Sequence, residues 1–262
     1  MKKIFTFLLS ALLLLSLLLS FGVAAKEGAY QWYIKREKDH KQPQIAKEMA
    51  WIVRYGGYYA DTTRIDNSGE KVLYLTFDAG YENGNVAKIL DILKEEEVTG
   101  AFFVLSHMIK DEGDLIKRMK AEGHLVCNHT ASHKDNTKIS EEDLKNDIIR
   151  LEKEYTALTG EQMDKYFRPP EGKFTESSLK TVAELGYKTI FWSNAYADWD
   201  NNRQMSAEKA KEKLLANTHN GAVILLHPTS NVNAAILREV IQEWKKEGYS
   251  FGTLYDLTER AR

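Results

Sequence analysis

The sequence has little of what marks several large classes of protein. It contains 262 residues and a single cysteine, Cys127, so no disulfide can form within the chain. Its 36 lysines and arginines face 38 aspartates and glutamates, which leaves no basic surplus to neutralise nucleic-acid phosphates. At 43% hydrophobic and 28% charged residues, the composition is that of a folded globular protein. We therefore expect a globular chain without internal disulfides that binds no nucleic acid.

Several familiar catalytic motifs are also missing. No glycine-rich fingerprint follows the first predicted strand, which counts against dinucleotide binding. No Gly-x-Ser-x-Gly elbow occurs, and Cys127 lies in an apolar strand, where a thiol is usually inert. His129 and His133 are four residues apart, but no Glu follows His129 as it would in a zinc-protease helix. Serine, cysteine and HExxH-type hydrolases are therefore disfavoured.

The N-terminus has the pattern of a secretory signal. Lys2 and Lys3 precede an apolar run over residues 4–21, and Val23-Ala24-Ala25 places small residues at a cleavage site. The run is also nearly long enough for an uncleaved anchor, which would be the chain's only link to a membrane. In both cases we expect export, with a signal at residues 1–25, an N-terminal extension at 26–70 and the main domain at 71–262.

The extension is polar but carries scattered aromatic residues. These side chains either pack on the main domain or serve as platforms for sugar rings, and packing is favoured because large aromatic surfaces need burial. The residues concerned are Trp32, Tyr33, Trp51, Tyr55, Tyr58 and Tyr59.

From Lys71 onward, short apolar runs alternate with amphipathic helical patterns. This alternation predicts an α/β fold with a parallel sheet, arranged as an irregular (β/α) barrel of about seven strands; an open doubly wound sheet is the alternative. The expected strands cover residues 72–77, 101–105, 125–127, 166–167, 189–192, 222–226 and 250–254. The expected helices include 115–122, one beginning at a Ser140 capping box, 177–185, 207–215 and 234–246.

Polar residues follow these strands repeatedly. In a parallel α/β barrel such positions meet at one end of the sheet, where active sites form. They are Asp78, His129, His133, Arg168, Asp198 and His227. Taken singly, each has a structural alternative, such as a turn-capping aspartate, a surface-loop arginine or a core histidine.

Together these residues suggest a hydrolytic site. In a helical turn, the spacing of His129 and His133 would place both imidazoles on one face, where they could share a metal. Asp78 could act as a general base or a metal ligand, and Arg168 could keep it ionised. Asp198 could orient His227 or raise its pKa so that it acts as an acid.

These segments, taken as a set, resemble the polysaccharide deacetylases of carbohydrate esterase family 4, with its NodB homology domain. Five motifs appear in the family's order between about residues 71 and 254. They are Thr76-Phe77-Asp78-Ala79-Gly80, His129-Thr130-Ala131-Ser132-His133, Arg168-Pro169-Pro170, Asp198-Trp199 and Leu225-Leu226-His227.

The resemblance implies a role for each motif residue. Asp78 would be the base held ionised by Arg168, and His227 the acid steadied by Asp198. The Tyr81 backbone N–H would stabilise the oxyanion and Trp199 would contact substrate. His129 and His133 would hold a divalent metal (zinc, cobalt or manganese).

Within the family, Tyr81-Glu82-Asn83-Gly84 and the Gln31-Trp32 region look like the delta-lactam-biosynthetic branch. That branch deacetylates N-acetylmuramic acid in peptidoglycan glycan strands after stem-peptide removal, and the freed amine closes to the lactam of spore cortex. We expect a monomer acting on such strands outside the cytoplasm, in the cell wall or around the forespore. The alternatives are a deacetylase of peptidoglycan glucosamine, chitin or xylan, and a non-catalytic wall-glycan-binding relative.

One residue departs from the family pattern. Ala79 stands where the usual aspartate metal ligand would be, so metal affinity is expected to be low, although the muramic branch tolerates a change here. The anionic lactyl group of that substrate favours a nearby cation, which Lys173 or Arg203 could supply despite Glu171.

Overall fold

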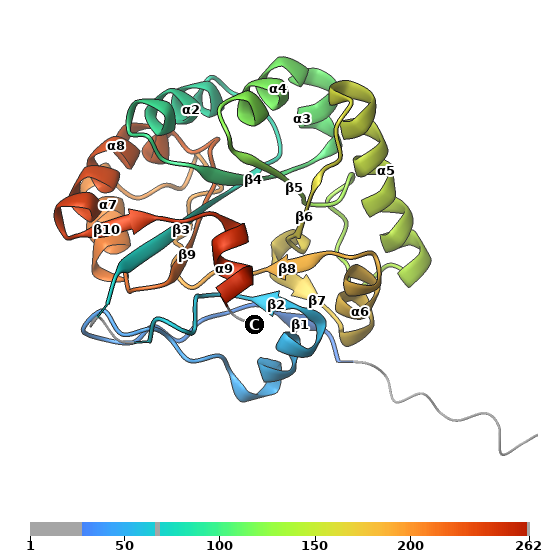
Figure 1. Cartoon of the computed structure of the whole chain (residues 1–262), viewed down its shortest axis with the longest axis horizontal. Helices are drawn as coiled ribbons and strands as arrows, with labels where there is room; N and C mark the ends of the chain where they lie inside the picture. Colours follow the sequence, from blue (N-terminus) through green and yellow to red (C-terminus); the bar gives the residue numbers. More distant parts are fainter. Residues whose placement is uncertain (1–27, 66–68, 261–262) are drawn as a thin grey trace, which may run out of the picture.

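A curled parallel β-sheet forms the centre of the protein and carries helices around its outer face (Figure 1). The computed structural model describes residues 28–65 and 69–260, so the predicted signal at 1–25 lies outside the described residues. Within those ranges, no helix combines the length and apolar character needed to cross a membrane.

The sheet has the strand order β10-β3-β4-β5-β6-β8-β2, with β9 also paired to β3. A parallel bridge between Asn194 and Ile224 links the segment after β8 to β9, so the sheet curls back toward its own beginning. This confirms the predicted α/β class and the curled parallel sheet. The strands are β2 (Gly57–Tyr58), β3 (Lys71–Ala79), β4 (Gly100–Val104), β5 (Leu125–Asn128), β6 (Asp164–Phe167), β8 (Lys188–Ile190), β9 (Ala222–Leu226) and β10 (Tyr249–Phe251).

The helices other than the C-terminal one lie outside the curl (Figure 1). The α-helices are α2 (Asn85–Glu95), α3 (Ser106–Asp111), α4 (Gly113–Ala121), α5 (Glu141–Thr159), α6 (Glu176–Glu184), α7 (Ala207–Ala216), α8 (Asn231–Lys246) and α9 (Leu254–Arg260), and the 3-10 helices are η1 (Lys47–Tyr55) and η2 (Pro170–Gly172). Ser140 caps α5 as expected, since its hydroxyl accepts from the Asp143 N–H at 3.1 Å.

The last strand, expected over residues 250–254, is shorter than predicted. It ends at Phe251, and Leu254 begins α9 instead. Thr253 and Asp256 explain the boundary, because the Asp256 carboxylate accepts from the Thr253 N–H at 2.8 Å while the Thr253 hydroxyl accepts from the Asp256 N–H at 3.3 Å. This pair caps a helix start that the apolar pattern alone had concealed.

Strand β3 shows how the sheet separates its two faces. Leu73, Leu75 and Phe77 belong to the core cluster shared with α2 and α8, whereas Val72 and Tyr74 belong to the cluster inside the curl. Because side chains alternate along a strand, the next even-numbered positions also face inward.

Helix α9 occupies one end of this interior. Leu254 and Leu257 pack in the same inner cluster as Tyr74 and Tyr166, and the Tyr166 hydroxyl is 3.1 Å from that of Thr258. The end at which the strands begin is thereby filled. The carboxyl ends of the strands are left to form the site.

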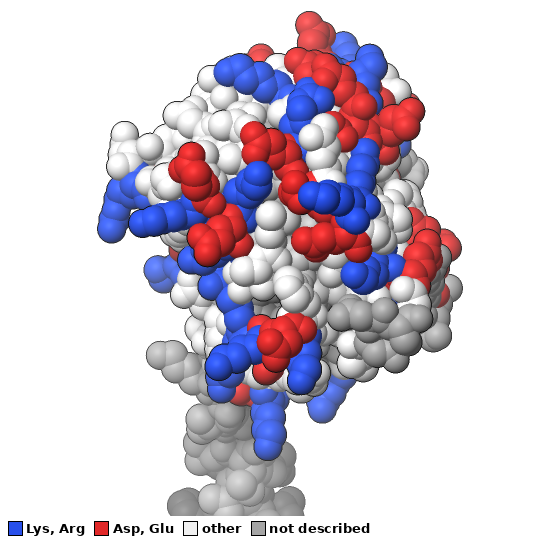
Figure 2. Space-filling view, turned by 90° about the vertical axis from the view of Figure 1, so that its left-hand side faces the viewer, with Lys and Arg blue, Asp and Glu red and all other residues white. Residues whose placement is uncertain are grey.

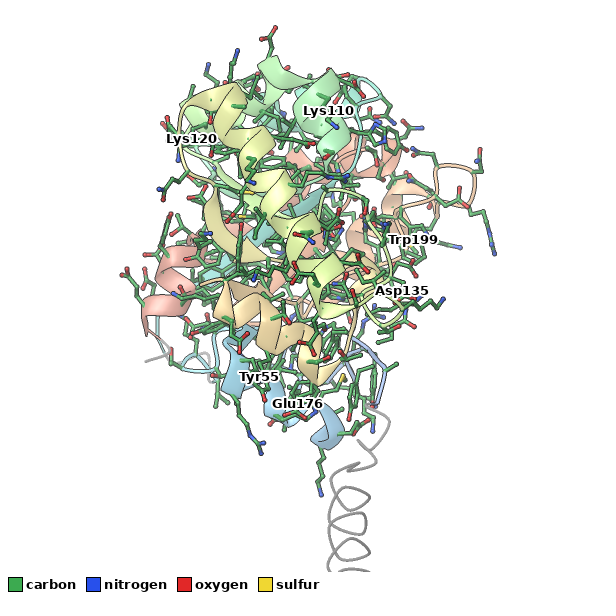
Figure 3. The ribbon with its side chains drawn as sticks, turned by 90° about the vertical axis from the view of Figure 1, so that its right-hand side faces the viewer. Tyr55, Lys110, Lys120, Asp135, Glu176 and Trp199 are labelled. Atoms are coloured by element: carbon green, nitrogen blue, oxygen red, sulfur yellow. The ribbon has the colours of Figure 1, made fainter. Side chains whose placement is uncertain are left out.

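The N-terminal extension packs against the main domain, as favoured from the sequence. β1 (Tyr30–Gln31) pairs with β7 (Lys173–Phe174), and Trp32 is buried against Phe191, with ring centroids 4.4 Å apart. Farther along, the Tyr55 hydroxyl meets the Glu176 carboxylate at 2.9 Å, and Figure 3 shows these two residues side by side. The strand β2 was not foreseen, because two residues carry no readable periodicity.

The face over α7 and α8 mixes charges of both signs (Figure 2). Lys211 pairs with Glu239 at 2.7 Å, and Lys245 with Glu96 at 3.1 Å. Exposed pairs of this kind add little stability. Their alternation leaves no broad patch of one sign on this face.

Candidate active site

A cleft of about 870 Å³ opens at the carboxyl ends of the strands. Its walls include four of the predicted residues, Asp78, His129, His133 and His227. Arg168 and Asp198 are almost completely buried and contact Asp78 and His227 directly. The structure thus brings together six residues that span some 150 positions of sequence. The remaining wall residues are Gln31, Trp32, Arg36, Gly80, Tyr81, Leu105, Glu171, Gly172, Trp192, Ala195, Tyr196, Ala197, Trp199, Leu225 and Thr229.

Asp78 lies at the end of β3 on its inward face, two residues after Thr76. One carboxylate oxygen accepts from the Arg168 guanidinium at 2.7 Å, and the other is 3.5 Å from His129 Nε2. Burial acts to raise the pKa of Asp78, but the attraction of Arg168, followed by those of His129 and His227, outweighs it and lowers that pKa. Asp78 is therefore an ionised carboxylate facing the cleft, as a base must be.

Arg168 is fully buried, and its guanidinium N–H groups donate several hydrogen bonds. Besides Asp78, its guanidinium donates to the Thr76 hydroxyl at 2.8 Å and to the Ile190 carbonyl at 2.9 Å. It also lies 4.2 Å above the Phe103 ring. A buried ion pair is tolerable only with such additional hydrogen bonds. The surface-loop alternative for Arg168 is excluded.

The segment carrying His129 and His133 is a loop, not a helical turn. Thr130 and His133 have φ of 66° and 55°, and the Thr130 hydroxyl accepts from the His133 N–H at 2.9 Å. The reasoning from helical spacing was therefore wrong. The two rings nevertheless meet, with centroids 4.9 Å apart and planes at 72°, because two left-handed residues fold the loop back on itself.

The imidazole of His129 is oriented for a ligand in the cleft. Its Nδ1–H donates to the Arg168 carbonyl at 2.8 Å, which leaves Nε2 facing Asp78. Burial lowers the pKa of His129 to about 4, against the opposing attraction of Asp78. A neutral imidazole held through its other nitrogen by a carbonyl is the usual arrangement of a metal-binding histidine.

A complete metal cage is not formed by these residues. Within 28–65 and 69–260, no three His, Cys, Asp or Glu side chains converge as metal ligands would. Ala79 occupies the position where the family pattern has an aspartate ligand, and it is fully buried in the apolar core cluster. The donor set fits a weakly held ion bound by His129 and His133, with open positions left for water or substrate.

His227 and Asp198 form a second polar unit across the cleft. Asp198 Oδ1 accepts from His227 Nδ1 at 2.7 Å, and Oδ2 accepts from the His227 N–H at 2.8 Å and from the Asn233 amide at 2.6 Å. Burial acts to lower the pKa of His227, but the adjacent Asp198 outweighs it and raises that pKa. The ring is therefore more easily protonated than an ordinary imidazole, and with Nδ1 bound to Asp198 it presents Nε2 to the cleft.

Two aromatic residues flank the opening. Trp199 is 63% exposed, and its ring lies 6.3 Å from that of His227. Tyr81 is 52% exposed on the segment that follows Asp78. In Figure 3, Trp199 lies at the same edge of the molecule as Asp135, which comes two residues after His133. Such exposed rings beside acid–base groups suit a sugar chain.

The contribution of the N-terminal extension to this cleft was not predicted from the sequence. Gln31, Trp32 and Arg36 line it although they precede Asp78 by more than 40 residues. No strand-end rule applies to them, so only the pairing of β1 with β7 reveals their position. The two cations proposed from sequence are elsewhere: Lys173 is engaged by Glu171 at 2.6 Å and Asp135 at 3.3 Å, and Arg203 is not part of the wall.

A carboxylate paired with arginine and a histidine paired with aspartate, in an open cleft flanked by aromatic rings, are the arrangement expected of a hydrolase for a polymeric sugar. The chain belongs to the polysaccharide deacetylase family, whose family model matches residues 65–190. It is 40% identical to the peptidoglycan-N-acetylmuramic acid deacetylase PdaA of Bacillus subtilis, covering 92% of each chain. The solved structure of that family 4 carbohydrate esterase superposes with a TM-score of 0.83, covering 91% of this chain and all of the other.

A second relative acts on a different sugar. The peptidoglycan-N-acetylglucosamine deacetylase of Bacillus cereus is 31% identical, over 72% of this chain and 89% of its own length. The family resemblance and the enzyme class predicted from the five motifs are therefore confirmed.

Proposed function

We propose that this enzyme hydrolyses the N-acetyl group of N-acetylmuramic acid in peptidoglycan. The observation that carries the proposal is the extent of similarity to the B. subtilis muramic acid deacetylase. A match over 92% of this chain includes part of the N-terminal extension, and that extension supplies walls of the cleft. The match to the glucosamine deacetylase is both weaker and shorter.

The proposed reaction breaks the acetamide C–N bond and forms a C–O bond to water. Asp78 takes a proton from the attacking water, while Arg168 keeps the carboxylate ionised. The developing oxyanion is stabilised at the Tyr81 backbone N–H, a role carried over from the family. His227, held by Asp198, gives its proton to the departing amine, so that acetate and a free amino sugar leave.

A divalent metal is part of the proposal. Deacetylases of this family are generally metal-dependent, and here His129 and His133 would hold the ion, with zinc, cobalt or manganese as the candidates. Bound there, it would polarise the substrate carbonyl and lower the pKa of a coordinated water. With Ala79 buried in the core, no third protein ligand comes from that position, so we expect weak binding.

The place of action is also a proposal. The apolar N-terminal run supports export to the cell wall or the space around the forespore. Release of the amine beside the lactyl carboxylate of muramic acid permits ring closure to a lactam, the modification of spore cortex.

The test is acetate release from glycan strands stripped of stem peptides. The protein is first depleted of metal and then supplied with zinc, cobalt or manganese, with chitin oligomers as the comparison substrate. We expect release that returns with metal and is confined to the muramic strands. Release from chitin or glucosamine strands alone would assign a different sugar. No release from any strand would leave a wall-binding relative.

A further inference from the structure

Arg36 is the one lysine or arginine among the residues that the structure shows lining the cleft. It comes from the N-terminal extension, four residues after Trp32. The extension is fixed at this point, since the Trp32 N–H donates to the Gly172 carbonyl at 2.7 Å and its indole donates to the Trp192 carbonyl at 2.9 Å. The hydrogen bonds of Trp32 therefore fix the segment that places Arg36 at the cleft.

The guanidinium of Arg36 is positioned but not neutralised. It donates to the Ala195 carbonyl at 2.9 Å, which ties it to the segment between β8 and the Asp198 motif. Among the described residues, no carboxylate lies within ion-pair distance of it. A guanidinium has five N–H donors in a planar fork, so donors remain after one hydrogen bond.

Two other cations near the cleft, Arg168 and Lys173, are already engaged. Arg168 is buried against Asp78, and Lys173 is shared between Asp135 and Glu171. Among the described residues that line the cleft, Arg36 is therefore the one lysine or arginine, and it has no carboxylate partner that would keep it from an anion of the substrate.

N-acetylmuramic acid carries such an anion close to its reacting group. Its lactyl ether is attached to the carbon next to the one bearing the acetamide, so its carboxylate enters the same cleft as the scissile bond. The planar fork of an arginine matches a carboxylate in two parallel hydrogen bonds. An intact stem peptide converts that carboxylate into an amide and removes the charge.

We propose that Arg36 binds the lactyl carboxylate and makes the enzyme selective for muramic acid without its stem peptide. The inference rests on the proposed function and names the residue behind its specificity. Arg36 orients the sugar through a contact that does not involve the bond that breaks, so it acts mainly on substrate binding.

The test compares two substrates that differ only in charge. One is a muramic acid glycan with the free lactyl carboxylate, and the other is the same glycan converted to the lactamide. We expect the wild type to prefer the carboxylate by roughly 10- to 100-fold in kcat/KM, the range for a charge-assisted hydrogen bond. In Arg36→Gln this preference falls toward one through a higher KM, whereas Arg36→Lys retains part of it. Arg203→Gln, the same change at an exposed arginine outside the cleft, keeps the wild-type preference.

The outcomes separate this inference from the proposed function. A wild type that deacetylates the muramic strands with a preference that Arg36→Gln leaves intact would overturn the role of Arg36 alone. A wild type inactive on both muramic substrates would overturn the proposed function and, with it, this inference. Thermal unfolding of each variant checks that the fold is kept. Weakening of the preference at high ionic strength supports the ion pair, because this guanidinium is partly exposed to screening salt.

Discussion

Replacing Asp198 by asparagine probes the acid side of the site with almost no change of shape. In the native protein both oxygens of this buried carboxylate accept hydrogen bonds, two from His227 and one from Asn233, at 2.6 to 2.8 Å. Asparagine has only one acceptor oxygen. Its amino group must therefore face either the His227 ring or the two donors on the other side.

Both orientations harm His227. If the amide nitrogen faces the ring, Nδ1 must become the acceptor and the neutral tautomer is locked with its proton on Nε2. If it faces the other two donors, two hydrogen bonds are lost in a buried place. Losing one charged hydrogen bond costs about 1.5–3 kcal/mol, so we expect a clear fall in the free energy of unfolding. Loss of acid catalysis should lower the rate about 10²- to 10⁴-fold.

The pH dependence gives the decisive readout. Asp198 raises the pKa of His227, so the protonated ring, and the activity that needs it, persist below that pKa and are lost as pH rises through it. In Asp198→Asn the alkaline limb of kcat/KM against pH should move to lower pH. The stability that the charged ring contributes below its ordinary pKa should also shrink.

Steady-state acetate release over a range of pH measures both effects. Asp200→Asn is the matched control, because the Asp200 carboxylate accepts from the Asn202 N–H at 2.9 Å outside the catalytic cleft, and an asparagine side chain can accept the same hydrogen bond. An Asp198→Asn enzyme whose rate falls while its alkaline limb stays in place would refute the acid role of the dyad. The contact would then be purely structural.

Three further predictions follow from contacts in the same region. Asp78→Asn should lower kcat about 10²- to 10⁴-fold and also reduce stability by leaving Arg168 buried without its anion; a folded variant with a near-normal rate removes the base role. His133→Ala should weaken zinc binding measured by competition with a chelator dye, and unchanged affinity would place the metal elsewhere. Trp32→Ala should lower the free energy of unfolding by about 3–5 kcal/mol, because the ring is buried against Phe191. In urea unfolding, Tyr33→Ala at a 43% exposed position should cost far less, and equal losses would contradict the packing argument.

Much of this architecture is legible in local patterns. The seven main strands and the principal helices follow from apolar periodicity, because a buried strand or an amphipathic helix needs its apolar residues at fixed spacing. The rule that parallel strands end at one edge then gathers Asp78, Arg168 and His227 before any coordinates are known. The boundary between β10 and α9 was predicted wrongly, because the hydrogen bonds between Thr253 and Asp256 start a helix where the apolar pattern indicated a strand.

Other features depend on contacts between distant parts of the chain. The meeting of His129 and His133 was expected for the wrong reason, since two left-handed loop residues, not a helix, bring the rings together. Lys173 was expected to be available as a cation, but Asp135 and Glu171 both pair with it. Neither backbone handedness nor ion pairing is encoded in residue spacing.

The amino-acid sequence by itself determined the fold class, the family and the choice of residues proposed for acid–base chemistry, because these depend on short-range periodicity and on motifs confined to a few residues. Only the tertiary structure decided that the N-terminal extension completes the cleft and that Arg36 faces it without a carboxylate partner among the described residues. The physical reason is distance along the chain. The hydrogen bond from Arg36 to Ala195 joins residues 159 positions apart, and such a contact exists only once the sheet has curled and β1 has paired with β7.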